Sequence, residues 1–258
     1  MRIILCIFVL LAPCAAGAWG VVGHCTIGEM SERLLTDEVR RKVTAVLGNA
    51  SLAMVSNWAD NVRSDSAWSY AETWHYTNLD SGLSRASFDT AAVSTHSGQC
   101  VFRVMSLIDH LKQQPNDTSM LKMLVHLMQD MHCPLHMGHA SDRGGNSVYM
   151  QWFGRRVSLH SIWDSGMIEG QHLSYTEYAN HLMRVNRLQR LTFSGSHRDV
   201  LDWAYGIFQT LPVVYGSALS FEKKSSYSYV YYHKPLYETC LVQSAERLAA
   251  VLNYLYSE

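Results

Sequence analysis

Hydrophobic side chains recur every three or four positions along most of this chain, which is the period of an amphipathic α-helix. Similar spacings predict helices over 27–34, 39–47 and 121–128, with Gly48 as the stop of the second. A short helix is also expected to carry Trp58, Asp60 and Arg63. The two longest apolar stripes are Val101, Val104, Met105, Ile108 and Leu111, and Leu241, Ala245, Leu248, Leu252 and Leu255.

The segment 147–159 lacks this helical period. It is rich in Val, Tyr, Trp and Phe around Gly154, which predicts one short β-hairpin. Further on, Ser196 and Asp199 have the spacing of a capping box, so a helix is expected to begin there and run through Phe208. Because no repeat or low-complexity segment interrupts the chain, we expect a mainly α protein: a single compact helical domain with at most one short β-hairpin.

Length and charge narrow the functional classes. A chain of 258 residues can bury a sizeable core and is usually one domain. Its 21 Lys and Arg nearly balance its 22 Asp and Glu, so no extended basic surface for nucleic acid is indicated. A polyanionic substrate would therefore be held locally, by metal ions or a few arginines. The 13 histidines stand out, and clustered histidine is typical of zinc proteins.

The first 18 residues are expected to be a signal peptide. Arg2 supplies positive charge, residues 3–11 form an apolar run, and Ala16-Gly17-Ala18 is a small-residue cleavage site. The run is too short to span a membrane, although an uncleaved anchor is the alternative. Cleavage after Ala18 would leave a functional domain of residues 19–258, secreted or held in the lumen of the secretory pathway.

In an oxidising compartment, cysteines usually pair in disulfide bonds. Disulfide bonds are expected there, with three connectivities open for the four cysteines that follow the signal peptide: Cys25, Cys100, Cys133 and Cys240. The triplets that begin at Asn49 and Asn116 are candidate glycosylation sites, consistent with a secreted glycoprotein.

The densest chemistry lies between residues 126 and 164. His126 with Asp130, and His160 with Asp164, are i,i+4 pairs, which on a helix lie on one face and suit one cation. His136 follows a proline that should end the first helix. Upstream candidates are Trp19, through the amine and carbonyl that cleavage would expose, and His24, Asp60 and His75. These nine residues suffice for three Zn²⁺ ions if one carboxylate bridges two of them.

Six motifs between residues 19 and 164 carry a family resemblance. They are W-x4-H, W-A-D-x-V-R, W-H-Y-T-N, H-x3-D followed by P-L-H, G-G-N, and L-H-S-I-W-D. In this order they resemble the class I zinc-dependent nucleases, the single-strand nucleases and 3′-nucleotidases of fungi, plants and trypanosomatids. The segment L-V-Q-S-A-E-R-L-A-A-V-L-N is similar to the closing helix of that family.

The resemblance implies three metal sites. The first zinc would be held by Asp60, His75, His126 and Asp130; the second by His136, His160 and Asp164; the third by the Trp19 main chain, His24 and Asp130. It also implies that Asp60 orients the attacking hydroxide and that Arg63 compensates phosphoryl charge. Substrates would be single-stranded DNA and RNA and 3′-mononucleotides, with 5′-phosphate products, and the protein is expected to be a monomer.

The chain departs from the family pattern at several points. Tyr76 keeps an aromatic residue for base stacking, but Asn78 stands where a carboxylate is common, so base preference is open. Cys133 and Ser158 replace residues beside the ligands. His132 and His139 are interpreted as satisfied or exposed histidines rather than ligands. The tyrosines between 227 and 237 could stack bases, but packing is favoured.

Two other functions are open. A zinc phospholipase C uses a similar cluster and an N-terminal Trp ligand, but its last helical ligand is Glu, whereas this chain has Asp164. A secreted metal-binding protein without catalysis is the other alternative, and Arg63, which no zinc ion needs, argues against it.

Overall fold

The computed structural model describes residues 19–96, 98–221 and 226–257, and it confirms the mainly α single domain with one hairpin. The α-helices are α1 (Val21–Leu34), α2 (Asp37–Val46), α3 (Leu52–Val55), α4 (Trp58–Val62), α5 (Arg85–Ala92), α6 (Cys100–Gln113), α7 (Thr118–Asp130), α8 (Leu159–Ser161), α9 (Met167–Glu169), α10 (Tyr175–Val185), α11 (His197–Phe208), α12 (Leu211–Phe221) and α13 (Ser226–Tyr256). The remaining elements are the 3₁₀ segments η1 (Ser66–His75), η2 (Pro134–Met137) and η3 (Ala140–Asp142), the π-helix η4 (Ile162–Gly166), and strands β1 (Tyr149–Trp152) and β2 (Arg155–Ser158).

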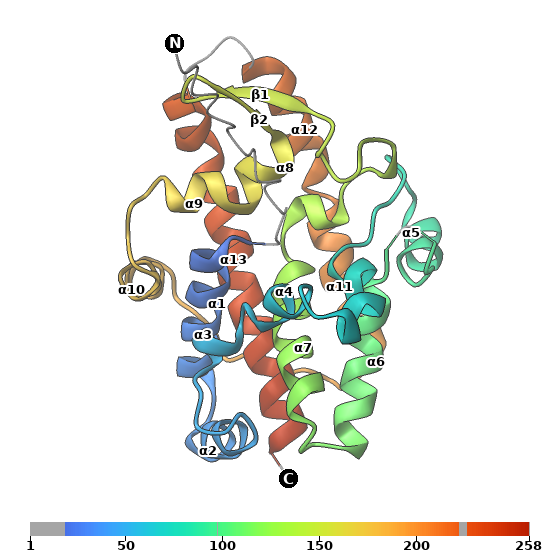
Figure 1. Ribbon diagram of the computed structural model, residues 1–258, viewed down its shortest axis with the longest axis vertical. Helices are drawn as coiled ribbons and strands as arrows, with labels where there is room; N and C mark the ends of the chain where they lie inside the picture. Colours follow the sequence, from blue (N-terminus) through green and yellow to red (C-terminus); the bar gives the residue numbers. More distant parts are fainter. Residues whose placement is uncertain (1–18, 97, 222–225, 258) are drawn as a thin grey trace, which may run out of the picture.

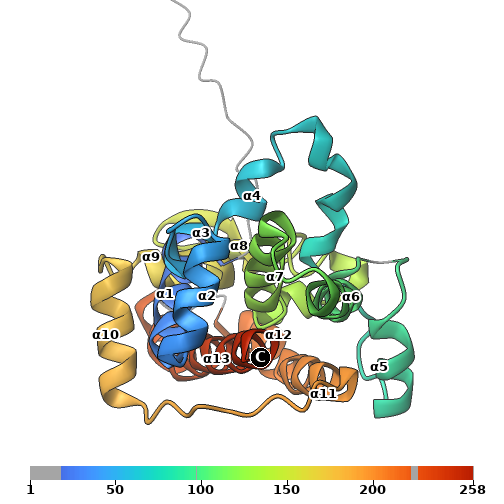
Figure 2. The same ribbon diagram turned by 90° about the horizontal axis from the view of Figure 1, so that it is seen from below.

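Two layers of helices enclose the core. Helices α1, α7 and α6 lie side by side over α13 and α11, while α10 and α5 flank the two sides (Figure 2). Helix α13 runs nearly the full length of the molecule, from the hairpin end to the C-terminus (Figure 1). The short α4 and the η1 segment project from this body beside α7 (Figure 2), against the C-terminal turns that carry His126 and Asp130.

Helix α7 is the central element of the site. Leu121 and all residues from Met123 to Asp130 are buried, so the helix is covered on every side. A helix surrounded in this way buries polar positions as well as apolar ones. His126 and Asp130 lie off its main apolar stripe and are nevertheless fully buried, because α1, α3, α4 and η1 pack against their face.

Several local predictions are refined by the structure. The hairpin forms with register Tyr149 to Ser158 and Trp152 to Arg155, and its turn residues Phe153 and Gly154 both have positive φ. Helix α4 ends at Val62, so Arg63 is its C-cap rather than an interior residue.

The start of α11 also differs from its prediction. Ser196 is the N-cap, but its hydroxyl accepts from Arg198 N, and the Asp199 carboxylate accepts from Ser194 N instead of Ser196. The predicted capping box is therefore wrong, because residue 194 competes for that carboxylate. Helix α13 begins at Ser226, well before the predicted apolar stripe, and contains Pro235.

The described cysteines are Cys25, Cys100, Cys133 and Cys240, and in the structure all four are buried thiols. The expected disulfide bonds are thus not formed among them. Asn49 and Asn116, the two candidate glycosylation sites, are exposed in turns between helices. The proposed signal peptide, residues 1–18, lies outside the described residues. In the part of the chain that the structure describes, no helix has the length and apolar character needed to cross a membrane.

Candidate metal centre

The centre is built around two residues of α7. His126 and Asp130 are one helical turn apart, and His126 Nε2 lies 3.1 Å from Asp130 Oδ2. The other ring nitrogen, Nδ1, donates to the carbonyl of Ser56 at 2.7 Å. That hydrogen bond fixes the ring orientation and directs Nε2 toward the carboxylate, the arrangement in which a histidine is oriented for a cation by an outer partner.

Two residues from the projecting segment close one side. His75, the last residue of η1, has its Nδ1 3.0 Å from both His126 Nε2 and Asp130 Oδ2. Asp60 of α4 lies slightly farther out, with Oδ1 3.8 Å from the nearest nitrogen of His75 and of His126. The backbone after His75 is anchored by Thr77 N donating to the His136 carbonyl at 2.7 Å. This bond joins the two halves of the site.

Helix α1 closes the opposite side. His24 Nε2 lies 3.5 Å from Asp130 Oδ1, and its Nδ1 donates to Gln129 Oε1 at 2.6 Å. The Gln129 amide in turn donates to the Ser56 hydroxyl. The Trp19 indole donates to the Gln129 carbonyl at 2.9 Å, so the first described residue is held beside Asp130.

A second group lies on the far side of Asp130. The His136 ring, carried by η2, donates from Nδ1 to the His75 carbonyl at 2.7 Å, while its Nε2 lies 4.0 Å from Asp164 Oδ1. His160 stacks on His136 with ring centroids 5.1 Å apart and donates from Nδ1 to the Gly144 carbonyl at 2.7 Å.

The G-G-N motif explains the position of His160. Arg143, Gly144 and Gly145 all have positive φ, and a Cβ on Gly144 would come within 2.5 Å of the Leu135 carbonyl oxygen. Only glycine fits at that point. The tight loop thereby presents the Gly144 carbonyl to the His160 ring. The sequence predicted a regular helix for His160 and Asp164, but Asp164 lies in the π-helix η4, a form that recurs at functional sites.

The buried donors and acceptors fit a set of cations. In the described residues, groups whose ligand atoms all lie within 4.8 Å of one another are His24, His126 and Asp130; Asp60, His75 and His126; and Cys133, His136 and Asp164. Buried atoms without a hydrogen-bond partner include His24 Nε2, Asp60 Oδ1, Asp130 Oδ1, His136 Nε2 and Asp164 Oδ1. Imidazole nitrogen and carboxylate oxygen are ligands of zinc, and unpaired buried polar atoms are costly unless something binds them.

The grouping differs from the expected sets at several points. His126 belongs to two groups, whereas Asp130 belongs only to the group with His24 and His126. His160 is absent from the compact third group, although it stacks on His136, and the Cys133 thiol takes its place. The sequence analysis placed Cys133 beside the ligands and did not predict it to be one. The sequence could have indicated a ligand at this position, because thiolate binds zinc and Cys133 lies three residues before His136. Gln129 and Ser56, which orient the two central histidines, carried no recognisable sequence signal.

The protonation of the metal-free centre reflects its crowding. Burial lowers the pKa of His126, but the charges of Asp130 and Asp60 outweigh it and raise the pKa to about 9. Burial lowers the pKa of His136 to about 3. For Asp164, burial and the neighbouring Asp130 and Asp60 raise the pKa well above its usual value. The centre therefore contains carboxylates that repel one another when no cation is bound.

A pocket of about 250 Å³ opens onto the centre. It is lined by Arg63, Glu72, His75, Tyr76, Asn78, Leu135, His136, Arg143, Asn146 and His160. Arg63 extends from the end of α4, with its Nη1 3.7 Å from Asp60 Oδ1. Arg63 thus shares one pocket with the predicted base-contacting pair, Tyr76 and Asn78, while Asp60 is next to Arg63 but is not part of the lining.

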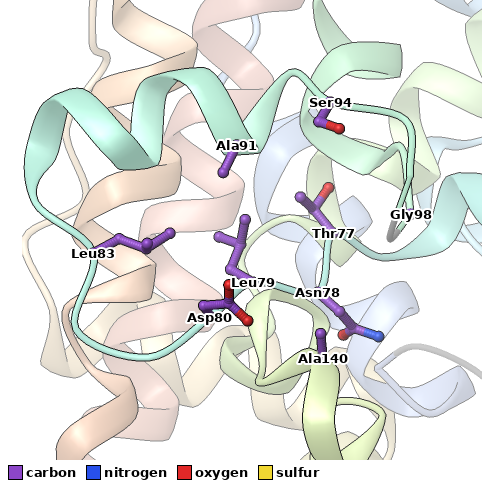
Figure 3. Close-up of a pocket in the computed structure, with 9 residues that line it drawn as sticks. All are labelled: Thr77, Asn78, Leu79, Asp80, Leu83, Ala91, Ser94, Gly98 and Ala140. Atoms are coloured by element: carbon purple, nitrogen blue, oxygen red, sulfur yellow. The ribbon is translucent and has the colours of Figure 1, made fainter.

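A smaller pocket of about 170 Å³ adjoins the first and shares Asn78 with it. Asn78 and Ala140 lie at one edge of this pocket, and Ala91 and Ser94 lie across from them (Figure 3). The side-chain amide oxygen of Asn78, Oδ1, is buried without a hydrogen-bond partner. Asn78 is therefore an available acceptor in the wall between the two pockets.

The remaining histidines and tyrosines divide by environment. His132 donates to the Met128 carbonyl, and burial lowers its pKa to about 3, while His139 stacks on Tyr215. Neither belongs to a group of potential ligands among the described residues. Of the tyrosines, Tyr229 and Tyr237 are buried, as packing predicts. The side chains of Tyr227, Tyr231 and Tyr232 are largely exposed to solvent.

The sequence of this chain is similar to those of known nucleases. The chain is 27% identical to Endonuclease 5 of Arabidopsis thaliana, over 93% of this chain and 90% of the relative. It is 27% identical to Nuclease S1 of Aspergillus oryzae, over 93% and 92%. With Nuclease P1 of Penicillium citrinum the identity is 30% over 62% of this chain and 63% of the relative. The S1/P1 nuclease family model matches residues 19–257, and the chain therefore belongs to the S1/P1 nuclease family.

Proposed function

We propose that this nuclease is a zinc-dependent hydrolase that cleaves single-stranded DNA and RNA at the P–O3′ bond, leaving a 5′-phosphate and a free 3′-hydroxyl. We also propose that the same site releases phosphate from 3′-mononucleotides. The observation that carries the proposal is the convergence of buried imidazoles and carboxylates on Asp130, which has both oxygens directed at histidines from different elements. A bridging carboxylate of this kind suits two cations.

Three zinc ions match the donor set. Asp60, His75, His126 and Asp130 would hold the first; His136, His160 and Asp164 the second; and the Trp19 main chain, His24 and Asp130 the third. The orientation of the rings supports this assignment, since His24, His126, His136 and His160 each donate Nδ1–H to an oxygen and leave Nε2 for a cation. Bound zinc would supply Lewis acidity that activates water and polarises phosphoryl oxygens.

The chain's own residues then bind and orient the reacting groups. Asp60 is 14% exposed and lies 3.7 Å from Arg63, which lines the pocket, so its carboxylate can orient the attacking water in line with the departing 3′-oxygen. Arg63, 32% exposed beside it, can form paired hydrogen bonds to the phosphoryl oxygens. Tyr76 offers a stacking face for one base and Asn78 an amide for its edge.

We also propose that residues 1–18 are removed, that the product enters the secretory pathway, and that Asn49 and Asn116 are glycosylated. The family match begins at Trp19, which supports cleavage before that residue. Cleavage would provide the free amine that the third zinc ion requires.

One experiment tests the proposed function. Elemental analysis of the chain beginning at Trp19 is combined with assays on 3′-AMP, a single-stranded oligonucleotide and phosphatidylcholine, before and after chelation. We expect three zinc ions and chelator-sensitive hydrolysis of both nucleotide substrates. Hydrolysis of phosphatidylcholine alone would identify a phospholipase C, and bound zinc without any hydrolysis would identify a non-catalytic metal-binding protein.

A further inference from the structure

A shallow groove continues from the pocket at the metal centre. It has a volume of about 640 Å³ and is lined by Arg143, Asn146, Tyr149, Arg156, Val157, Ser158 and Ser161. Arg143 and Asn146 line both the groove and the metal-centre pocket. A polymer bound at the metal centre can therefore extend into the groove without leaving the protein surface.

The hairpin contributes a flat platform to this groove. Tyr149 on β1 pairs with Ser158, so Arg156 on β2 is its diagonal neighbour on the same face. The Arg156 guanidinium carbon lies 3.8 Å from the centroid of the Tyr149 ring, and the ring is 44% exposed. A tyrosine and a guanidinium stacked in this way form a planar surface on which a nucleobase can also stack.

The groove carries positive charge. Its lining contains two arginines and no carboxylate. In the described part of the chain, neither Arg143 nor Arg156 forms an ion pair with an acidic side chain. Since the whole chain carries a formal net charge of −1, this positive charge is a local feature. It complements the phosphates of a nucleic acid strand.

We propose that this groove binds the nucleotides adjacent to the one held at the metal centre. Tyr149 would stack on a base, and Arg156 and Arg143 would contact the flanking phosphates. This inference rests on the proposed nuclease function and adds to it a preference for polymers over mononucleotides. The occupant is a single strand, because its unpaired bases are free to stack on the platform.

The hairpin offers a matched control for the test. Arg155 and Arg156 are both exposed and adjacent on β2, but successive residues of a strand point to opposite faces. Arg155 lies outside the groove.

Arg156→Ala, Tyr149→Ala and Arg155→Ala are therefore compared as zinc-loaded proteins on 3′-AMP and on a six-nucleotide single strand, at low and high salt. A six-nucleotide strand with abasic flanking positions separates stacking from charge.

We expect Arg156→Ala and Tyr149→Ala to raise KM for the six-nucleotide strand about five- to tenfold and to leave 3′-AMP hydrolysis unchanged. Arg156→Ala should also weaken the salt dependence, and the abasic strand should be insensitive to Tyr149→Ala. Arg155→Ala should resemble the wild type. Equal effects of Arg155→Ala and Arg156→Ala, or no effect of either groove variant, would overturn the proposal while the nuclease function stands.

A different result separates the two proposals. If the wild type cleaves no nucleotide substrate, the proposed function fails, and fluorescence anisotropy with the six-nucleotide strand then judges the groove directly. Tighter binding by the wild type than by Arg156→Ala would still support the groove. Equal binding by the two proteins would reject it.

Discussion

The Trp19 indole donates a hydrogen bond to the carbonyl of Gln129, the residue directly before Asp130. Trp19 is fully buried, and its ring packs edge-on against Tyr237 of α13 at 4.8 Å. The side chain therefore anchors residue 19 to the last turn of α7, which carries the carboxylate that the proposed first and third zinc ions share. Residue 19 is held there by side-chain packing, independently of any metal.

This relationship predicts that an extension before Trp19 removes one zinc ion. With Gly-Ser added, the amine becomes an amide, which is not basic and cannot bind zinc in the same way. We expect two zinc ions instead of three and a large loss of 3′-AMP hydrolysis, measured together on the extended and authentic forms. Full activity with three zinc ions in the extended form would rule out Trp19 as a ligand.

Gln129→Leu tests the support of His24. The Gln129 side chain accepts a hydrogen bond from His24 and donates one to Ser56. Without this side chain, the His24 ring, whose Nε2 faces Asp130, loses the hydrogen bond that fixes its orientation. We expect the affinity for one zinc ion to fall about 10- to 100-fold while the other two remain bound. Titration with a competing chelator measures this, and Gln129→Glu, which keeps an acceptor for His24, is the control. Uniform weakening of all sites would instead indicate a general loss of folding.

Arg63→Ala tests the charge clamp. An arginine is not a ligand of zinc, and Arg63 is only partly buried, so folding and zinc content should be unchanged. We expect kcat to fall about 10²- to 10³-fold, as for removal of a donor that stabilises the transition state. Arg63→Lys should recover part of the loss, because it restores charge without the bidentate geometry. An unchanged kcat would make the arginine structural.

Zinc binding should release protons at neutral pH. In the metal-free protein the pKa of His126 is raised to about 9, so this ring is protonated at pH 7, but a zinc ligand must be neutral. Zinc affinity should accordingly increase as pH rises toward 9. The proton itself stabilises the metal-free fold below pH 6.5, and this contribution is lost as pH rises through about 9. Calorimetry in buffers of different ionisation enthalpy counts the protons released.

Single strands should be cut far faster than duplexes. The pocket of about 250 Å³ can take one splayed nucleotide, and stacking on Tyr76 requires an unpaired base. Cleavage of a hairpin oligonucleotide, mapped by gel, should therefore occur in the loop. Comparable rates in stem and loop would contradict this model of the pocket.

The sequence by itself determined the parts of this protein that depend on local spacing. Helical periodicity identified the main helices, and the i,i+4 spacing of His126 and Asp130 was enough to bring both to one side of α7. The β-branched and aromatic residues around Gly154 likewise identified the hairpin. These features are decided by the geometry of a few consecutive peptide units.

Tertiary structure decided which distant groups meet. The Gly144 carbonyl that orients His160, the Gln129 side chain that orients His24, and the approach of Cys133 to Asp164 all depend on packing between separate elements. The thiol state of the cysteines was decided in the same way. Such contacts could not be read from spacing, because their energies depend on the positions of side chains from several elements packed together.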